Sequence, residues 1–184
     1  MKKIVQRDAE ILRETAEEVP LADIPSSKIQ TILKEMNVAL ASQEDGVALA
    51  APQIGYSLRI FVVSPKVANI VKKDGKKKGA SDEEKKAKGP EHLVYINPVI
   101  KKLSREKAEV EEGCLSVRYL YGTVSRSTKA LVEAYDENGK KFTQGGTGLV
   151  AQIFQHETDH LNGILFIDKA KHLEELPPEN IKNN

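Results

Sequence analysis

Five neighbouring residues in the last third of the chain could hold a metal ion and activate water. His156, Glu157, Thr158, Asp159 and His160 form an H-E-x-x-H sequence. If they are helical, the two imidazoles lie one turn apart on one face and reach a single ion, with the Glu157 carboxylate beside them as a base. The motif therefore predicts a metal-dependent hydrolase. The alternative is that both histidines are hydrogen-bonded core residues.

The sequence around the motif predicts that it lies on a largely buried helix. Apolar residues recur at helical spacing between residues 147 and 161, at Leu149, Val150, Ile153, Phe154 and Leu161. The following pair, Asn162 and Gly163, is a helix stop signal. The helical setting favours the metal site over a chance match of five residues.

Two imidazoles are too few ligands for a metal site, so a third ligand must come from elsewhere. The only cysteine of the chain is Cys114. One thiolate and two imidazoles would leave a fourth position open for water, as a catalytic site requires. Cys114 could instead be an inert buried residue, or a nucleophile with His156 as its base. The nucleophile hypothesis leaves Glu157 and His160 without roles.

A third segment, residues 46–55, is rich in small side chains and precedes a strand-like run at 58–63. Small residues allow close backbone approach, so Gly46, Val47 and Ala48 could form a wall against which an extended peptide pairs. Gln53 could present an amide donor to a developing oxyanion. The alternative interpretation of this segment is a tight turn between a helix and a strand.

Together the three segments resemble the peptide deformylase family, whose members remove the formyl group from the initiator methionine of new polypeptides. That family carries G-x-G-L-A-A-P-Q, E-G-C-L-S and Q-H-E-x-D-H-L-x-G stretches in this order. The corresponding stretches here are residues 46–53, 112–116 and 155–163. The resemblance extends in order and spacing over about residues 1 to 170, and a chance metalloprotease match would not supply the other two segments.

The resemblance implies roles for six residues. Cys114, His156 and His160 match the family's metal ligands. Glu157 matches its general acid/base. Gln53 and the backbone N–H of Leu115 match its oxyanion donors. It also implies one divalent ion per chain, natively Fe(II), with Zn(II) or Ni(II) as possible replacements. A thiolate with imidazoles independently suits iron or zinc and disfavours magnesium or calcium.

Further residues are expected around this centre. Glu112, Asp159 and Gln155 are candidates for orienting a ligand imidazole, and Glu112 could act through Arg126. The chain departs from the family pattern at Ala48, where a second glycine is usual. It also departs after Val117, where many members have proline and this chain has Arg118-Tyr119-Leu120-Tyr121. Its aromatics could line the substrate groove, although packing explains most of them. Neither change touches a ligand, so activity is expected and peptide preference stays open.

Composition indicates one compact enzyme domain spanning residues 1–184. The 184 residues carry a net charge of +1, which points to no sequence-specific nucleic-acid partner. No apolar run is long enough for a membrane span, and the first residues do not form a secretory leader. A single cysteine excludes an internal disulfide, so a cytoplasmic location is expected.

The pattern along the chain predicts an α+β fold, with an N-terminal helix and antiparallel strands packed around a central metal-binding helix. Ser26 and Ser27 precede helical apolar spacing that ends before Gly46. Strands are expected at 60–63, 94–100, 130–135 and 141–143, with a hairpin turn at 136–139.

Two segments are expected to lie outside this framework. Residues 66–92 form a polar, Lys-rich insert that resembles a solvated loop. A transient ribosome contact through its lysines is a further hypothesis. Residues 171–184 are expected to be a short C-terminal tail, because Pro177 and Pro178 would end any helix. His92 and His172 are expected to be surface residues.

Three functional classes are consistent with the sequence. A deformylase would release formate from formyl-methionyl peptides. A zinc endopeptidase shares H-E-x-x-H, but it would cleave internal bonds and needs no E-G-C-L-S segment. A catalytically silent binding homologue is disfavoured because every expected ligand and the base are present.

Overall fold

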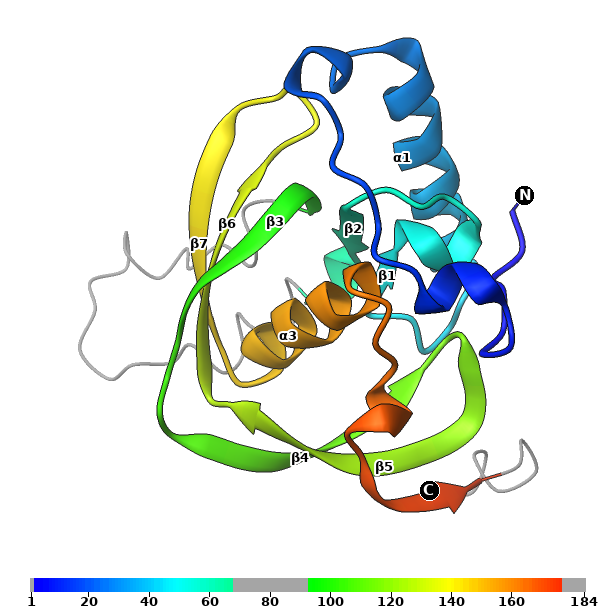
Figure 1. Ribbon diagram of the computed structural model, residues 1–184, viewed down its shortest axis with the longest axis vertical. Coiled ribbons are helices and arrows are strands. Elements are labelled where there is room, and N and C mark those ends of the chain that lie inside the picture. Colours follow the sequence, from blue (N-terminus) through cyan, green and yellow to red (C-terminus); the bar gives the residue numbers. More distant parts are fainter. Residues whose placement is uncertain (1, 68–92, 177–184) are drawn as a thin grey trace.

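The computed structural model describes residues 2–67 and 93–176 and shows two antiparallel sheets with helix α3 (Leu149–Leu161) between them (Figure 1). The larger sheet has the order β1-β2-β3-β6-β7, with bounds Ala48–Ala50, Ile60–Val63, Val94–Leu103, Lys129–Tyr135 and Lys141–Thr147. The smaller sheet has the order β4-β5-β8, with bounds Lys107–Cys114, Val117–Ser127 and Lys171–Glu175. This is the predicted α+β class.

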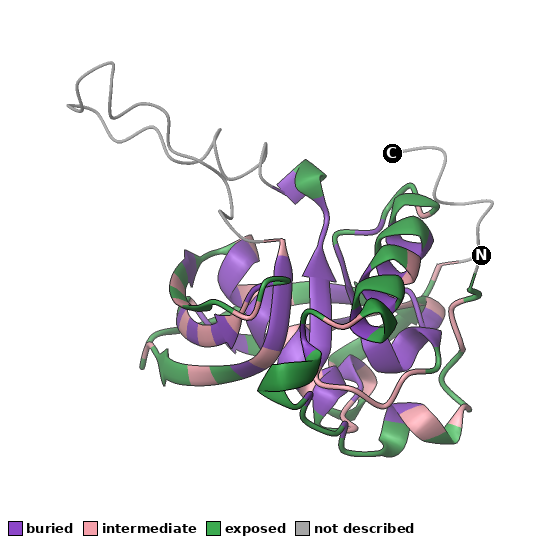
Figure 2. Ribbon diagram, turned by 90° about the horizontal axis from the view of Figure 1, so that it is seen from above, coloured by how far each residue is buried: buried purple, intermediate pink, exposed green. Residues whose placement is uncertain are grey.

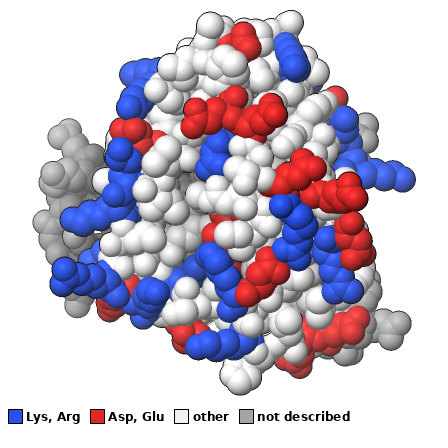
Figure 3. All heavy atoms as spheres, in the orientation of Figure 1, with Lys and Arg blue, Asp and Glu red and all other residues white. Residues whose placement is uncertain are grey.

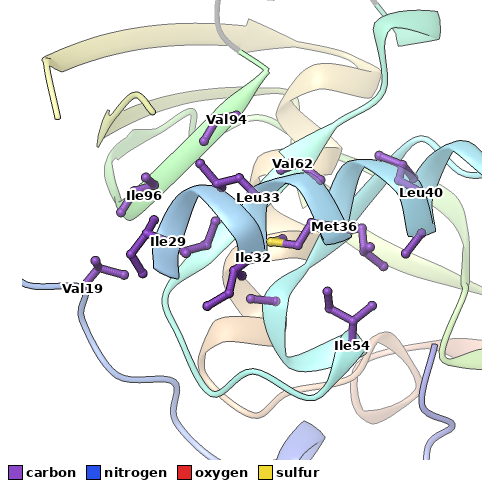
Figure 4. Close-up of a cluster of buried hydrophobic side chains, with 14 of the residues drawn as sticks. Val19, Ile29, Ile32, Leu33, Met36, Leu40, Ile54, Val62, Val94 and Ile96 are labelled. Carbon is purple, nitrogen blue, oxygen red and sulfur yellow. The ribbon is translucent and has the colours of Figure 1, made fainter. Parts of the chain in front are cut away.

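Helix α1 (Ser27–Ala41) covers one side of the larger sheet with a purely apolar face. The Ser26 hydroxyl caps its first turn by accepting a hydrogen bond from the Ile29 N–H. Figure 4 shows Ile32, Leu33 and Met36 directed toward residues of η3 (Ala51–Ile54), β2 and β3. The predicted N-terminal helix is therefore confirmed, and it ends five residues before Gly46.

Helix α3 packs against the larger sheet and, through its other side, approaches β5. Gly146 of β7 permits this packing, because a Cβ there would lie 2.6 Å from Val150 Cγ1. The helix ends where predicted: Asn162 follows it, and Gly163 adopts a left-handed φ of 71°. A side chain at Gly163 would also strike the Arg13 carbonyl oxygen, at 2.5 Å from the Cβ.

The predicted strands all form, and several are longer than expected. β3 extends to Leu103 and β7 to Thr147. The hairpin turn between β6 and β7 also forms: Asp136 Oδ1 accepts from the Asn138 and Lys140 N–H groups, and Gly139 has a φ of 78°.

The sequence did not predict the smaller sheet or β1. β4 contains few apolar residues and most of it is exposed, so its sequence gives only a weak strand signal. Residues 171–175 of the expected tail form β8, paired with β5. His172 lies on this strand and is exposed, as predicted. Of the insert expected at 66–92, only Lys66 and Val67 are described; Lys66 is exposed, whereas Val67 is buried in the core and not solvated. The rest of the insert, with His92, lies outside the described residues.

Burial follows the layers of the fold. Figure 2 shows buried residues concentrated in the central strands and on the inner sides of the helices. On the face drawn in Figure 3, acidic and basic side chains are interspersed. Among the described residues no helix combines the length and the apolar character that crossing a membrane requires.

Candidate active site

The three predicted metal ligands meet at one point between the two sheets. Cys114 ends β4, whereas His156 and His160 lie one turn apart on α3. One ligand atom of each residue lies within 4.8 Å of the others. The closest contact is 3.2 Å, between Cys114 Sγ and His160 Nε2. Residues distant in sequence therefore form a compact set of one sulfur and two nitrogen donors.

The position of Cys114 depends on the tight β4–β5 connection. The register shifts between Gly113 and Cys114, so Cys114 pairs with Val117 and only two residues separate the strands. Gly113 lies under the ring of Tyr121, and a Cβ at residue 113 would come within 2.8 Å of that ring. The Ser116 N–H then donates to Cys114 Sγ at 3.4 Å.

The surroundings of Cys114 favour the thiolate. Burial alone would raise the pKa of the thiol, but the nearby imidazoles of His160 and His156 lower it to about 5. A thiolate is the form of cysteine that binds metals. The donor set therefore fits a divalent ion such as iron or zinc.

Glu157 is buried next to both imidazoles. Burial raises the pKa of its carboxyl to about 6, although the charges of His156 and His160 oppose the shift. Its Oε2 atom has no hydrogen-bond partner among the described residues. A buried carboxylate oxygen without a partner is costly in a purely structural role, so Glu157 is available for a ligand or a proton.

Gln53 brings a third element, η3, to the same point. Its Oε1 accepts from the Ala50 N–H at 2.8 Å, which fixes the amide plane. Its Nε2 donates to Ser116 Oγ at 3.1 Å and approaches Cys114 Sγ at 3.5 Å. The predicted amide donor therefore points at the sulfur ligand. Sequence reasoning did not identify Ser116 as its partner.

A buried ionic network holds the outer side of the site. Glu112 Oε2 lies 2.9 Å from His156 Nδ1, and both Glu112 oxygens accept from Arg126, at 2.7 and 2.9 Å. Burial alone would raise the pKa of Glu112, but these two partners lower it to about 2. The carboxylate thus fixes the orientation of the His156 ring, and the predicted link between Glu112 and Arg126 is present.

Asp159 and Gln155 do not contact an imidazole. Asp159 accepts from Arg126 at 2.6 Å and from Lys169 at 2.7 Å, so it reaches His156 only through Arg126 and Glu112. The expectation that Gln155 orients an imidazole is wrong. Its amide pairs with the Ser127 N–H and carbonyl, both at 3.0 Å, because it faces β5 and joins α3 to that strand.

A cavity of about 320 Å³ opens onto this centre. Cys114, His156 and Glu157 line its inner part, and Gly46, Val47 and Ala48 line one wall. That wall leads into β1, an edge strand, so the side of β1 away from β2 carries no strand within residues 2–67 and 93–176. The other wall contains Leu115 and the segment 117–121.

Similarity to known proteins identifies the family of this chain. The family model for polypeptide deformylase matches residues 1–176. This chain belongs to the peptide deformylase family. A deformylase from Clostridium acetobutylicum, peptide deformylase 2, is 37% identical over 91% of this chain and 94% of its own length. Peptide deformylase 1A of Arabidopsis thaliana, chloroplastic/mitochondrial, is 38% identical over 92% of this chain, which spans only 61% of that protein.

Solved deformylase structures have the same fold. The Met-Ala-Ser-bound peptide deformylase of Acinetobacter baumannii superposes with a TM-score of 0.73 at 30% identity, covering 90% of this chain and 96% of that one. The chain is accordingly an enzyme with the mixed, antiparallel architecture of deformylases.

The sequence reveals the deformylase motifs but not the residues that hold the motif residues in place. Lys169 and Gln152 carry no motif signal, yet Lys169 holds Asp159, and Gln152 donates to the Glu111 carbonyl at 2.9 Å. The N-terminal segment also supports the site, since Gln6 Nε2 donates to the Leu115 carbonyl at 3.2 Å. The contacts of Gln152 and Gln6 join residues far apart in sequence, and no local pattern reveals any of the three.

Proposed function

We propose that this protein removes the N-formyl group from the initiator methionine of nascent polypeptides by metal-dependent hydrolysis, releasing formate. The observation that carries the proposal is the convergence of Cys114, His156 and His160 at one cavity, beside a buried Glu157 oxygen that has no hydrogen-bond partner among the described residues. One thiolate and two imidazoles leave a coordination position free, as a catalytic site requires.

The three ligands would hold one divalent ion, with Fe(II) as the proposed native metal and Zn(II) or Ni(II) as possible replacements. Bound there, the ion would supply Lewis-acid activation of water and of the formyl carbonyl. Glu112, anchored by Arg126, keeps His156 in the orientation that presents its other ring nitrogen to the centre.

Side-chain and backbone groups of the protein would transfer the proton and stabilise the developing negative charge. Glu157 takes a proton from the attacking water and returns it to the amine that leaves with the peptide. Negative charge develops on the formyl oxygen during attack. The Gln53 amide and the backbone N–H of Leu115 are the proposed donors to that oxygen.

The cavity suits an extended peptide. The edge strand β1 and the small residues before it offer main-chain groups for pairing, so Gly46, Val47 and Ala48 would form the substrate wall. The related Acinetobacter enzyme is described with Met-Ala-Ser bound. A formyl-methionyl peptide is therefore the substrate class proposed here.

The deciding experiment is product analysis with formyl-Met-Ala-Ser and protein loaded anaerobically with Fe(II). We expect stoichiometric formate and free Met-Ala-Ser, loss of activity after chelation, and its return when the metal is restored. Cleavage of an internal bond without formate would identify an endopeptidase instead. Neither reaction in a folded, metal-loaded sample would indicate a silent binding homologue.

Three expectations stay predictions. These are a single catalytic domain over residues 1–184, a cytoplasmic location inferred from the lone cysteine, and a transient ribosome contact. The described residues carry no feature that bears on ribosome binding.

A further inference from the structure

Arg118 is the only lysine or arginine among the described residues that line the cavity. It follows Val117 at the start of β5, so it belongs to the wall opposite Gly46 and Val47. The other charged residues of the cavity lining are acidic: Asp45, which contacts Arg118, Glu111 on β4, and Glu112 and Glu157 at the metal site. Among the described residues, Arg118 is thus the one lysine or arginine that a bound peptide can meet in this cavity.

The Arg118 guanidinium links the two walls. Its Nη1 donates to Asp45 Oδ2 at 2.8 Å, and its Nη2 donates to Gln43 Oε1. Gln43 and Asp45 lie in the connection between α1 and β1. The side chains of Arg118 and Asp45 are 31% and 58% exposed. Solvent therefore reaches both members of this ion pair.

An exposed ion pair is easily exchanged. Such pairs contribute about 0–1 kcal/mol, because water screens the charges and ordering two side chains costs entropy. A guanidinium also accepts any carboxylate in the same forked geometry. A peptide carboxylate that enters the cavity can therefore replace Asp45 on Arg118. Glu112 cannot compete, because Arg126 and His156 hold it.

We propose that Arg118 is a specificity-determining residue that favours peptides with an Asp or Glu side chain shortly after the formyl-methionine. The peptide carboxylate takes the place of Asp45, while a lysine at the same position meets Arg118 as a like charge. This inference rests on the proposed deformylase function.

The test compares kcat/KM for formyl-Met-Ala-Ser-Ala with variants carrying Glu, Gln or Lys at the second, third or fourth position. At one of these positions we expect the order Glu, Gln, Lys, with Glu preferred over Gln by about twofold to fivefold. The Glu/Gln ratio is taken within each enzyme, so differences in overall activity cancel. The preference should shrink as ionic strength rises.

Two variants give opposite expectations. Arg118→Gln should bring the Glu/Gln ratio to about one. Asp45→Asn should raise that ratio, because it removes the carboxylate that competes for Arg118. If Arg118 and Asp45 only brace the walls, both variants break the same contact and the ratio moves in the same direction or not at all. Arg105→Gln and Glu44→Gln are the charge-matched controls, since both residues are exposed and neither lines the cavity.

The failures of the two proposals are distinguishable. Formate release from the neutral peptide with a Glu/Gln ratio of one at all three positions would overturn the role of Arg118 and leave the deformylase function intact. A ratio that falls in Asp45→Asn would also overturn it. No formate from any peptide would overturn both proposals.

Discussion

Helices α1 and α3 are both amphipathic and both pack against the larger sheet, yet they bury different chemistry. The buried residues of α1 are all apolar. The buried residues of α3 include four polar ones, Gln155, Glu157, Thr158 and His160. Thus α1 contributes only apolar packing to the larger sheet, whereas α3 packs against the same sheet and also carries the polar residues of the site.

The difference extends to hydrogen bonding. Among the described residues, the buried side-chain polar atoms without a partner are Glu157 Oε2, Thr158 Oγ1 and His160 Nδ1, all on α3. Burying such atoms costs free energy, about 1–3 kcal/mol for each group. The apolar packing of Ile153, Phe154 and Leu161 offsets this cost. These unpaired atoms therefore reduce the stability that the burial of α3 provides, and two of the three belong to the proposed base, Glu157, and the proposed ligand, His160.

The largest effect should come from Glu157→Ala. Loss of the general acid/base should lower kcat by about 10²–10⁴-fold, while metal content stays unchanged because the three ligands remain. The free energy of unfolding should change little, since the deleted carboxylate has an oxygen without a partner. Formate release, metal analysis and urea unfolding measure the three quantities. Activity within tenfold of the wild type would remove Glu157 from the mechanism.

Arg126→Leu should impair both stability and activity. Arg126 is 5% exposed and donates to Glu112 and Asp159, so its loss leaves the buried Glu112 carboxylate without its guanidinium partner, whereas Asp159 keeps Lys169. Removing one partner of a buried ion pair costs about 3–5 kcal/mol. The His156 ring also loses its fixed orientation, so kcat of the protein that remains folded should fall. Arg126→Lys keeps the charge but not the forked geometry, and an intermediate loss is expected. If Arg126→Leu has the same free energy of unfolding as the wild type, the ion-pair network does not stabilise the fold.

Met36→Ala should lower the free energy of unfolding and leave kcat unchanged, which is the reverse of the effect expected for Glu157→Ala. Met36 is fully buried in the hydrophobic cluster between α1, η3, β2 and β3 (Figure 4). Truncating it leaves a cavity and should cost about 2–5 kcal/mol of unfolding free energy. Because α1 contributes no ligand or base, kcat at a temperature where the variant is folded should match the wild type. Val38→Ala is the matched control, since Val38 is an exposed residue of the same helix. A large loss of kcat in Met36→Ala would show that α1 is coupled to the site.

The same contrast explains which parts of the fold the sequence predicted. α1 and α3 have regular apolar spacing and clear end signals at Ser26 and Gly163, so both were recognised. The β6–β7 turn was recognised because the side chain of Asp136 and the backbone of Gly139 determine it locally. β4 was not predicted because it has few apolar residues and most of it faces solvent, so its strand signal is weak.

For the site, the motifs identified the groups that meet at the centre but not the contacts that hold them. Cys114, His156 and His160 could be named because their residue types limit the chemistry. The hydrogen bonds that Gln53 donates to Ser116 and Lys169 donates to Asp159 depend on how α3 packs with the segments around it. Gln155 was misjudged because its position beside a ligand histidine gave no information on the direction of its side chain.

The close approach of Gly163 to Arg13 has a consequence for synthesis. The first segment of the chain covers the end of α3: the Ala16 N–H donates to the Leu161 carbonyl at 3.0 Å, and Arg13 pairs with Asp168 at 2.6 Å. In a growing chain, Arg13 and Ala16 therefore lack these partners until residues 161–168 have been made. Contacts this distant in sequence form late in folding. The imidazole pair also comes after Cys114, so the three donors can meet only once residue 160 has been made.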